Sequence, residues 1–329
     1  MRDILEIRNS FALCADVKSI LQHGDPTIVA NPKITIIVPC YNHPFYLKKA
    51  LYSCVNQDYK EEYEIVVVDN DDSSDYTENR KVVEKLDSPK ILYYHNEKNI
   101  GGIGNWNRGV ELARAPYITY CHDDDMLLPN CLTLLMENRH GDKAVFGLRN
   151  HIDKNDRVTF ETKLHPKFFS ILKPRRVREY TLMHHFLLPL GFCVGSLYSR
   201  NKFIESGGFG TEFPPINDAA FAGRYTKYAG AVQLLVPTHN YRFAENDTFN
   251  VYRELAAAAK RIRESDKPFL PWPDWFLDCI IRANFNVSHY EIIRNFEPNA
   301  TDVVMPSWID RIICKLSGLV LRWSMYRIL

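Results

Sequence analysis

The sequence predicts an α/β protein whose main domain has a mostly parallel central sheet with helices on both faces. From Ile34 to Cys121, short unbroken apolar runs rich in β-branched and aromatic residues alternate with segments of helical period, a pattern typical of buried parallel strands and crossover helices. Polar residues also directly follow three of these runs. Because right-handed crossovers place the carboxyl ends of parallel strands along one edge, we expect a ligand site at that edge.

The individual elements follow from the same patterns. Strands are expected at 34–38, 64–68, 91–94, 117–121, 144–148, 192–198 and 232–236, and helices at 45–56, before Leu86, at 103–113 and at 218–225. Residues 1–30 show a helical period, with apolar side chains on one face at Ile4, Ile7, Phe11, Cys14, Val17 and Leu21. We expect a helical N-terminal extension (1–30), a main domain (31–250, with halves 31–142 and 143–250) and a helical C-terminal region (251–329).

Composition excludes several classes of protein. The 329 residues are 46% hydrophobic and 25% charged with a formal net charge of +1, which argues against a nucleic-acid partner because such proteins normally carry a basic excess. The eight cysteines are scattered singly, so we expect reduced, buried thiols rather than a zinc site or a disulfide framework. No signal-peptide pattern opens the sequence and no apolar run approaches the roughly 20 residues of a membrane span. We therefore expect a soluble, cytoplasmic protein.

Three adjacent acids, Asp123, Asp124 and Asp125, follow the expected strand 117–121. Like charges at contact distance repel, and a divalent cation with an anionic ligand is the usual agent that offsets such repulsion. Carboxylates are hard oxygen ligands, which suit Mn²⁺ or Mg²⁺ better than zinc. The alternative is an acidic turn that precedes a helix starting near Pro129.

Several motifs occur in a fixed order. They are Ile36-Ile37-Val38-Pro39-Cys40-Tyr41-Asn42, Val67-Val68-Asp69-Asn70, Asn99-Ile100-Gly101-Gly102 with Asn105 and Arg108, Asp123-Asp124-Asp125, Gly207-Gly208-Phe209 and Asn217-Asp218. With these motifs the chain resembles the family 2 glycosyltransferases, of the bacterial polysaccharide and O-antigen type, from about Ile34 to Thr248. The resemblance implies a GT-A nucleotide-sugar fold and inverting, metal-dependent transfer of a hexosyl group from a nucleotide-diphosphate sugar, a UDP-sugar above all. The implied acceptor is a hydroxyl of a glycan or of a lipid-linked glycan.

The resemblance also implies the residues that contact the donor. Tyr41 would stack on the base and Asp69 would accept a hydrogen bond from its imide N–H. Glycines such as Gly102 let a backbone approach ribose and phosphates closely, and Arg242 would pair with the diphosphate. The full expected set is Pro39, Tyr41, Asn42, Asp69, Asn99, Gly102, Asn105, Arg108, Asp123, Asp124 and Arg242. Purely structural roles are the alternatives: Tyr41 packed on the next helix, Arg242 on the surface, and Asp71, Asp72 and Asp75 as helix caps.

The resemblance assigns the metal to Asp123, Asp125 and His239, and the general base to Asp218. A base takes the proton of the acceptor hydroxyl, and a carboxylate suits this role if burial raises its pKa. Asn217 stands where the family has a glutamate, a departure that leaves Asp218 intact. The alternative for Asp218 is the N-cap of the following helix.

The C-terminal stretch 307–329 carries a separate pattern. As a helix it would place Ile312, Leu316, Leu319 and Trp323 on one side and Arg311, Lys315 and Arg322 on the other. Such a helix can lie on an anionic membrane, here the inner face of the cell membrane, or can pack on the core. Two alternatives to a glycosyltransferase stay open. One is a non-catalytic sugar-nucleotide-binding protein. The other is a nucleotidyltransferase acting on sugar phosphates, which should need a basic, glycine-rich phosphate loop near the first strand.

Overall fold

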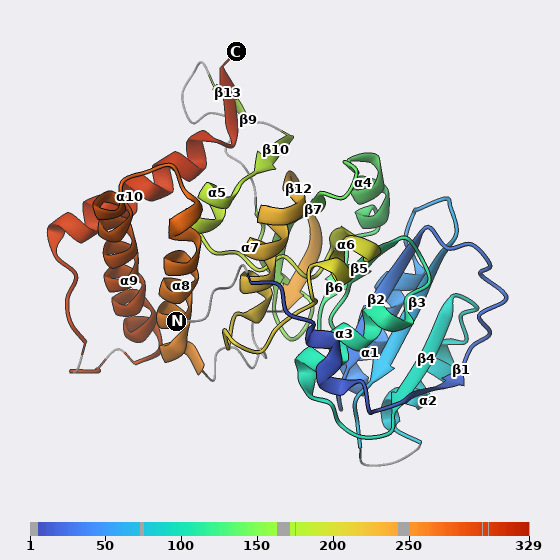
Figure 1. Ribbon diagram of the computed structural model, residues 1–329. Helices are drawn as coiled ribbons and strands as arrows, with labels where there is room; N and C mark the ends of the chain where they lie inside the picture. The colour runs from blue at the N-terminus through green and yellow to red at the C-terminus, as the bar shows by residue number, and fades with distance from the viewer. Residues whose placement is uncertain are drawn as a thin grey trace.

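The computed structural model describes residues 6–72, 76–162, 172–174, 176–242, 251–297, 299–301 and 303–328. Asp75, one of the expected helix caps, lies outside these ranges. Within them, eleven strands form one mixed sheet in the order β1-β4-β3-β2-β5-β11-β7-β12-β10, with β6 beside β12 and β8 beside β7 (Figure 1). The strands are β1 (Ser19–His23), β2 (Ile34–Cys40), β3 (Tyr63–Asp69), β4 (Ile91–Asn96), β5 (Tyr117–Tyr120), β6 (Met126–Leu127), β7 (Ala144–Ile152), β8 (Val158–Phe160), β10 (Val177–Tyr180), β11 (Ser196–Ser199) and β12 (Ala231–Arg242).

The central strands run as the sequence predicts. β2 pairs in parallel with β3 and β5, and β3 pairs in parallel with β4. β11 is antiparallel to both of its neighbours, β5 and β7, and it joins the two expected halves, 31–142 and 143–250, into one sheet. β12 then runs parallel to β7, so the sheet is parallel from β4 to β5 and mixed beyond β5.

Helices cover both faces of this sheet. They are α1 (Pro44–Val55), α2 (Glu78–Leu86), α3 (Gly101–Leu112), α4 (Cys131–Glu137), α5 (Leu182–Leu187), α6 (Arg200–Glu205) and α7 (Asn217–Ala229). Successive residues of β2 point to opposite faces. Ile36 and Val38 therefore join the cluster that contains Leu47 of α1, whereas Ile37 joins the cluster that contains Val110 of α3.

The expected N-terminal helix is wrong for the residues that the structure describes. Residues Ser10–Cys14 form a short 3₁₀ helix (η1), and β1 adds an antiparallel strand to the edge of β4. Phe11 and Val17 are buried, as their apolar character predicts. The edge of β4 offers unpaired backbone groups, and strand pairing satisfies more of them than an isolated helix could.

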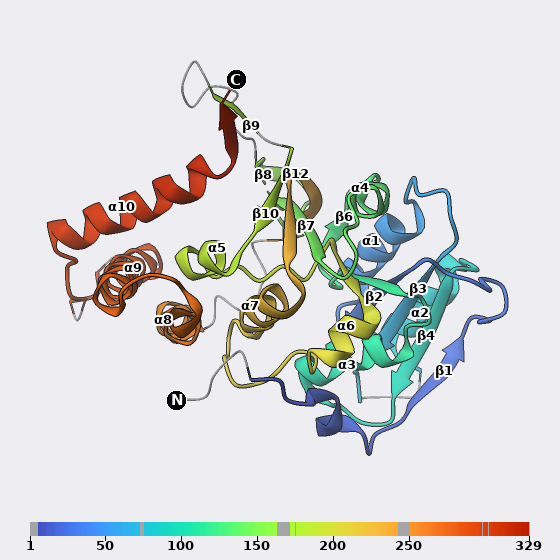
Figure 2. The same cartoon turned by 45° about the horizontal axis from the view of Figure 1, so that its top comes forward.

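The C-terminal region is helical, as expected. It contains α8 (Tyr252–Asp266), a short 3₁₀ helix η3 (Lys267–Phe269), α9 (Asp274–Phe296) and α10 (Trp308–Trp323). Figures 1 and 2 show α8, α9 and α10 grouped on the side of the molecule away from β1. β9 (Leu172–Pro174) and β13 (Tyr326–Ile328) pair as a separate two-stranded sheet.

Candidate active site

The three acids form a turn directly after β5, at the carboxyl edge of the parallel strands. On one side the backbone N–H of Tyr41, in the loop after β2, donates to Oδ2 of Asp123 over 3.1 Å. On the other side the backbone N–H of Arg242, the last residue of β12, donates to Oδ1 of Asp125 over 2.8 Å. The acidic turn is therefore fixed between the ends of two strands from different halves of the sheet.

The guanidinium of Arg242, expected to pair with a diphosphate, supports this turn through protein contacts. Its Nε donates to the carbonyl of Asp124 (2.8 Å), and its terminal nitrogens bond the carbonyl of Asp153 (2.6 Å) and the carboxylate of Asp156 (2.7 Å). The group is fully buried and lies over the ring of Tyr46, 4.4 Å from its centre. Because each guanidinium nitrogen has a protein partner, the expectation for Arg242 is corrected to a positioning role.

His122, Asp124 and Asp125 bring ligand atoms within 4.8 Å of one another, the one such group among the described residues. Two buried atoms of this set, Nε2 of His122 and Oδ2 of Asp125, have no hydrogen-bond partner. Burial lowers the pKa of His122 to about 4, which keeps its imidazole neutral and able to ligate a metal. An orphaned carboxylate oxygen next to a neutral imidazole fits a divalent cation.

The electrostatics of the acids agree with this fit. Burial and the neighbouring Asp123 raise the pKa of Asp124 to about 6, and burial, with Asp124 beside it, raises that of Asp125 well above its usual range. A cation would relieve both penalties at once. Asp125 keeps its expected place, but the group contains His122 and Asp124 in place of Asp123 and His239. His239 lies nearby in the wall of the same cavity, and its role as a ligand stays a prediction.

A cavity of about 240 Å³ opens beside the acidic turn. Its apolar walls come from residues such as Phe146 and Phe192. The ionisable side chains around it are those of His122, Asp125, Arg149, His151, Cys193, Asp218, His239 and Tyr241. The structure thus brings the expected general base and the expected metal ligand Asp125 to one cavity, although 93 positions separate them in the sequence (218 − 125).

Asp218 sits in the first turn of α7, where burial raises the pKa of its carboxyl and the N–H of Ala219 partly opposes that rise. Asn217, the departure from the family pattern, has a structural role, because its Oδ1 accepts the backbone N–H of Phe213 over 2.9 Å. The N-cap position belongs to Ile216, without a side-chain cap. Asp218 is therefore left facing the cavity.

Arg149 is a functional candidate that the sequence reasoning missed. It lies on β7 opposite His239 of β12, lines the cavity, and stacks over the ring of Tyr241 at 4.6 Å. Burial raises the pKa of Asp125 and of Asp218, and the positive charge of Arg149 partly opposes both rises. The pKa of His239 falls to about 3, mainly through burial and further through the charge of Arg149. The signal was present: Arg149 follows the expected strand 144–148, just as the acids follow theirs.

The carboxylate of Asp69 is occupied by hydrogen bonds within the protein. It is fully buried, and its two carboxylate oxygens accept hydrogen bonds from Thr77 Oγ1 (2.7 Å), the Tyr93 hydroxyl (2.6 Å), Asn79 Nδ2 (3.1 Å) and the N–H of Asp71 (3.1 Å). Four donors fill the acceptor capacity of a carboxylate. The expectation that Asp69 reads the base is corrected: it organises the loop after β3.

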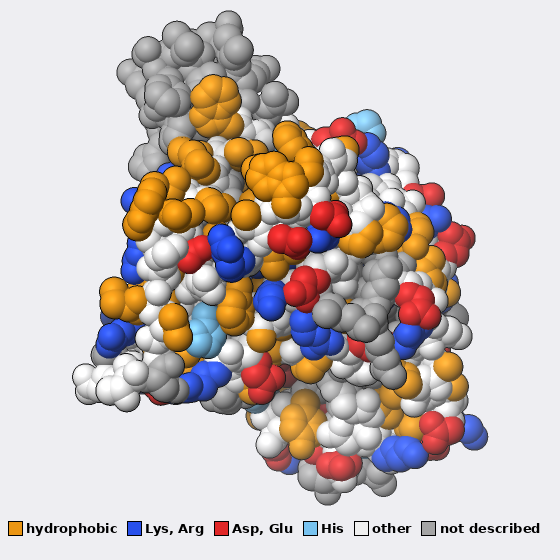
Figure 3. Space-filling model, turned by 60° about the vertical axis from the view of Figure 1, so that its left-hand side comes forward, with side chains coloured by type: hydrophobic (Ala, Val, Ile, Leu, Met, Phe, Trp, Pro, Cys, Tyr) orange, Lys and Arg blue, Asp and Glu red, His pale blue; other side chains and the backbone are white. Residues whose placement is uncertain are grey.

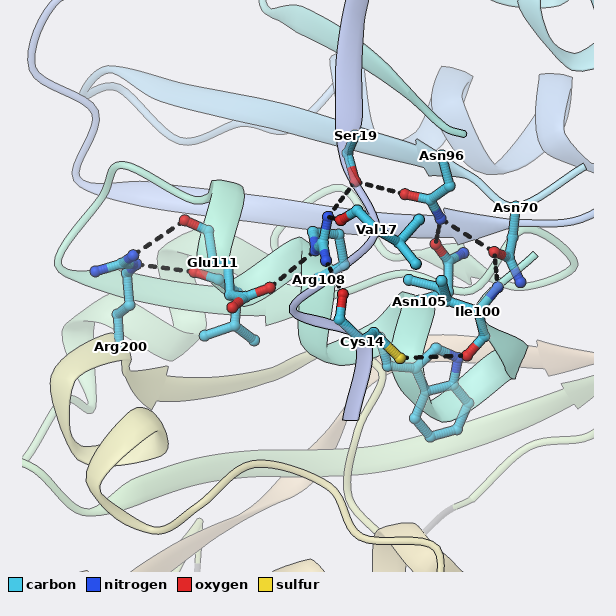
Figure 4. A network of polar contacts seen from close by, with 12 residues as sticks. Cys14, Val17, Ser19, Asn70, Asn96, Ile100, Asn105, Arg108, Glu111 and Arg200 are labelled. Atoms are coloured by element: carbon cyan, nitrogen blue, oxygen red, sulfur yellow. Dashed lines mark hydrogen bonds and ion pairs between the residues drawn. The ribbon is translucent and has the colours of Figure 1, made fainter. Parts of the chain in front are cut away.

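Asn105 and Arg108 are also structural (Figure 4). Asn105 Nδ2 donates to the carbonyl of Val68 (2.9 Å), and its Oδ1 accepts from Asn96 (2.9 Å). The guanidinium of Arg108 bonds the carbonyls of Cys14 and Val17 (2.8 and 2.7 Å), so it ties the N-terminal segment to α3. Both side chains are buried away from solvent, which corrects their expected contact with the donor.

The remaining expected donor residues divide by exposure. Pro39 is buried within β2, which corrects the expectation that it contacts a ligand. Tyr41 is 49% exposed, so the loop after β2 presents an aromatic ring at the strand ends. Asn42, the next residue of this loop, has a φ of +50°. Asn99 is exposed and its Oδ1 accepts the N–H of Gly101, at the start of α3. Gly102 beside it has open space where a side chain would stand.

Fold and site together define a helix-covered α/β sheet with a candidate cation group and a half-buried carboxylate around one cavity. Residues 35–206, about half of the chain, match the sequence profile of the family described as Glycosyl transferase family 2. The protein belongs to this family. The matched region covers β2 to α6 and therefore includes the acidic turn, while Asp218 lies beyond it.

Individual relatives give the same family and fold. The chain is 41% identical over 120 residues to a GalNAc(5)-diNAcBac-PP-undecaprenol beta-1,3-glucosyltransferase of Campylobacter jejuni; the match covers 35% of this chain and only 38% of that relative. TarS (residues 1–349) of S. aureus, solved in complex with UDP, superposes with a TM-score of 0.54 at 19% identity, over 82% of this chain and 76% of that one. The mannosyltransferase PcManGT of Pyrobaculum calidifontis, solved with GDP-Man and Mn2+, gives 0.53 at 16% identity over 92% and 84%. These likenesses show the GT-A fold, as predicted.

Proposed function

We propose that this family 2 glycosyltransferase transfers a sugar, with inversion, from a nucleotide-diphosphate sugar to a hydroxyl group of a glycan or of a lipid-linked glycan. A UDP-sugar is the proposed donor and polysaccharide biosynthesis the proposed context. One observation carries the proposal: the orphaned Oδ2 of Asp125 and the carboxylate of Asp218 belong to side chains that line one cavity of about 240 Å³. A leaving group and an acceptor must be held on opposite faces of the same sugar, and this cavity supplies a group for each.

Asp218 supplies the base. Its carboxylate takes the proton of the acceptor hydroxyl while the hydroxyl oxygen forms a bond to the anomeric carbon, and the bond from that carbon to the nucleotide diphosphate breaks on the opposite face. The raised pKa of Asp218, which burial causes, makes it a stronger base than an exposed aspartate. The chemistry is a single displacement, so the configuration at the anomeric carbon inverts.

His122, Asp124 and Asp125 would hold Mn²⁺ or Mg²⁺, which when bound neutralises negative charge on the departing nucleotide diphosphate. Arg149 lines the same cavity and adds a positive charge there. We propose that Arg149 takes the phosphate-facing role first expected of Arg242. Tyr41, half exposed on the loop after β2, remains the proposed stacking surface for the base.

The proposed donor and acceptor draw on the comparisons. TarS was solved with UDP and PcManGT with GDP-Man, so the fold accommodates more than one base. The Campylobacter jejuni relative is named as acting on an undecaprenol-linked glycan, and this supports a lipid-linked acceptor for the present chain.

Calorimetric titration of UDP, dTDP and GDP, each with and without Mn²⁺, tests the donor half of the proposal. We expect one nucleotide to bind in a metal-dependent manner, and Asp125→Ala to abolish that dependence. The matched control is Asp72→Ala, which removes an exposed aspartate from the neighbouring loop. Nucleotide binding that is equally tight without metal and in Asp125→Ala would refute the metal site.

The catalytic half is tested by the release of UDP from UDP-sugars. Asp218→Asn should bind the donor as the native protein does and lose turnover by about 10²–10⁴-fold. If Asp218→Asn turned over at the native rate, Asp218 would not be the base. If the native protein bound nucleotide but released none with any sugar or acceptor, a non-catalytic binder would be the better description.

A further inference from the structure

α10 presents an unpartnered apolar face. Its inner side packs on α9, where Leu321 joins Leu277 and Ile281 in one cluster. Its outer side carries apolar residues whose side chains are 41–71% exposed: Trp308, Ile309, Ile312, Leu316, Leu319, Val320 and Trp323. Figure 3 brings this side of the molecule forward, and hydrophobic side chains gather over its upper part. A soluble surface rarely leaves so many large apolar groups contiguous without a use.

The charges on α10 lie along one edge of that face. On a helical wheel, Arg311, Lys315 and Arg322 fall together beside Trp308 and Leu319, so they lie next to the apolar face and not opposite it as expected from the sequence. The one acidic residue of the helix, Asp310, is buried and accepts hydrogen bonds from Ser307 and Asn286. The outer face is therefore apolar and is bordered by basic residues along one edge, with no exposed carboxylate on the helix.

We propose that α10 lies flat on a membrane surface that contains anionic lipids, with its outer apolar residues, defined above, inserted between the headgroups. The helix is roughly 24 Å long at 1.5 Å per residue, and Trp308 and Trp323 stand at its two ends, where indole rings favour the headgroup level. Across the described ranges, no helix is long and apolar enough to cross a bilayer. The contact is thus one of a helix lying in the interface.

Charge favours this occupant over a second copy of the chain. Antiparallel pairing of two α10 helices about a twofold axis would set the basic edge of one against the same basic edge of the other, so Lys315 would face Lys315 of the second copy. Like charges in that position repel. An anionic headgroup layer meets the same edge with opposite charge, which attracts the Lys and Arg side chains to such a surface. The proposal concerns α10 alone and does not rest on the transferase activity.

Co-sedimentation of the full-length chain with vesicles tests it. We expect binding to vesicles of phosphatidylcholine with phosphatidylglycerol, weak binding to phosphatidylcholine alone, and release from the mixed vesicles at high salt. The double variant Ile312→Ser/Leu316→Ser should weaken the binding about tenfold or more, because two partly exposed side chains would no longer leave water. Lys315→Gln/Arg322→Gln should weaken it by about tenfold as well, and only on anionic vesicles.

Matched control variants distinguish binding through the outer face of α10 from non-specific binding of the protein to vesicles. Leu13→Ser/Ile20→Ser removes the same residue types at similar exposure (62% and 49%, against 55% and 46% for Leu316 and Ile312) from the opposite end of the chain. Lys60→Gln/Lys85→Gln removes two exposed lysines elsewhere. Both controls should bind vesicles as the native chain does. Because the changed side chains of the α10 variants are exposed, their melting temperatures and nucleotide binding should also match the native protein.

Three results would overturn the proposal. The first is a native chain that does not sediment with anionic vesicles. The second is equal loss of binding in the α10 variants and in their matched controls, or no loss in either. The third is a native dimer, measured by light scattering, that Ile312→Ser/Leu316→Ser converts to a monomer without changing vesicle binding, which would assign the face to a second copy.

Discussion

Oδ2 of Asp218 lies directly against Gly191: a β carbon built at position 191 would come within 1.7 Å of it. The backbone at Gly191 is not in the left-handed region, so an alanine could adopt this backbone conformation. Its only obstacle would be the steric clash of its β carbon with Asp218. Gly191 thus leaves the space in which the proposed base sits. No period or motif marks this glycine in the sequence, since the contact joins the segment before β11 to the start of α7.

Gly191→Ala should therefore displace the carboxylate of Asp218 and lower kcat by about 10²-fold, because a shift of about 1 Å in a reacting group costs that much. Donor binding should change little, since the atoms nearest to the added β carbon belong to Asp218 and not to the acidic turn. The readout is the initial rate of UDP release together with calorimetric donor affinity. Gly318→Ala is the control: a β carbon at Gly318 meets nothing within 4 Å, and the rate should stay native.

The half-buried carboxyl of Asp218 also predicts how the reaction rate and the stability of the protein depend on pH. Its pKa is raised by burial, so the acidic limb of the rate profile should lie above the range of an ordinary aspartate. The same shift disfavours the folded state once the group is charged: its favourable contribution is present at low pH and is lost as pH rises through the raised pKa. Asp218→Asn should thus melt at a higher temperature than the native protein at neutral pH, and the difference should vanish at low pH.

Arg149 offers a second readout on the same group. Because its charge lowers the pKa of Asp218, Arg149→Gln should move the acidic limb of the rate profile to higher pH, and should raise the KM for the donor if the guanidinium faces phosphate. Arg157→Gln, which removes an exposed arginine from the turn after β7, should change neither. An unshifted limb in Arg149→Gln would place its charge too far from Asp218 to act.

The sheet and its site were readable from the sequence wherever a strand ends in polar residues. Unbroken apolar runs such as Ile34–Val38 predict parallel strands because both of their faces are buried, and this alone places Asp123–Asp125 at a ligand edge. What the sequence could not show is where a polar side chain points. Asp69 and Arg242 end strands β3 and β12, and Arg108 lies in α3. Partners from distant segments take up the hydrogen-bonding groups of all three side chains.

Asp69 illustrates the consequence for stability. Hydrogen bonds to a charged group contribute roughly 1.5–3 kcal/mol each, and Asp69 accepts four while fully buried. Asp69→Ala should lower the free energy of unfolding by about 3 kcal/mol or more, measured by chemical denaturation. It removes the acceptor of Asn79 and of the Thr77 and Tyr93 hydroxyls, which as donors keep only the hydrogen bond between themselves. Asp72→Ala, on the exposed side of the same loop, should change it by less than about 0.5 kcal/mol. A folded Asp69→Ala protein of native stability that has lost nucleotide binding would restore the base-reading role.

A substitution at Gly102 tests most directly whether this glycine contacts the donor or has a structural role. A β carbon at this position meets nothing within 4 Å and the backbone is not in the left-handed region, so Gly102→Ala has no steric cost in the free protein. Alanine also favours the first turn of α3, and the melting temperature should stay equal or rise slightly. If the backbone here approaches ribose or phosphate, the added methyl group stands in the ligand's place and donor affinity should fall by about tenfold or more.

Calorimetry of the nucleotide beside thermal melting distinguishes the two cases for Gly102→Ala. Gly101, its neighbour, is unsuitable as a control because its φ is +73° and alanine would be strained there. Gly318→Ala again serves, since it adds a methyl group to an open helical position far from the sheet edge. Unchanged donor affinity in Gly102→Ala would remove this glycine from the donor site and leave Tyr41 and Asn99 as the residues of that edge still to be tested.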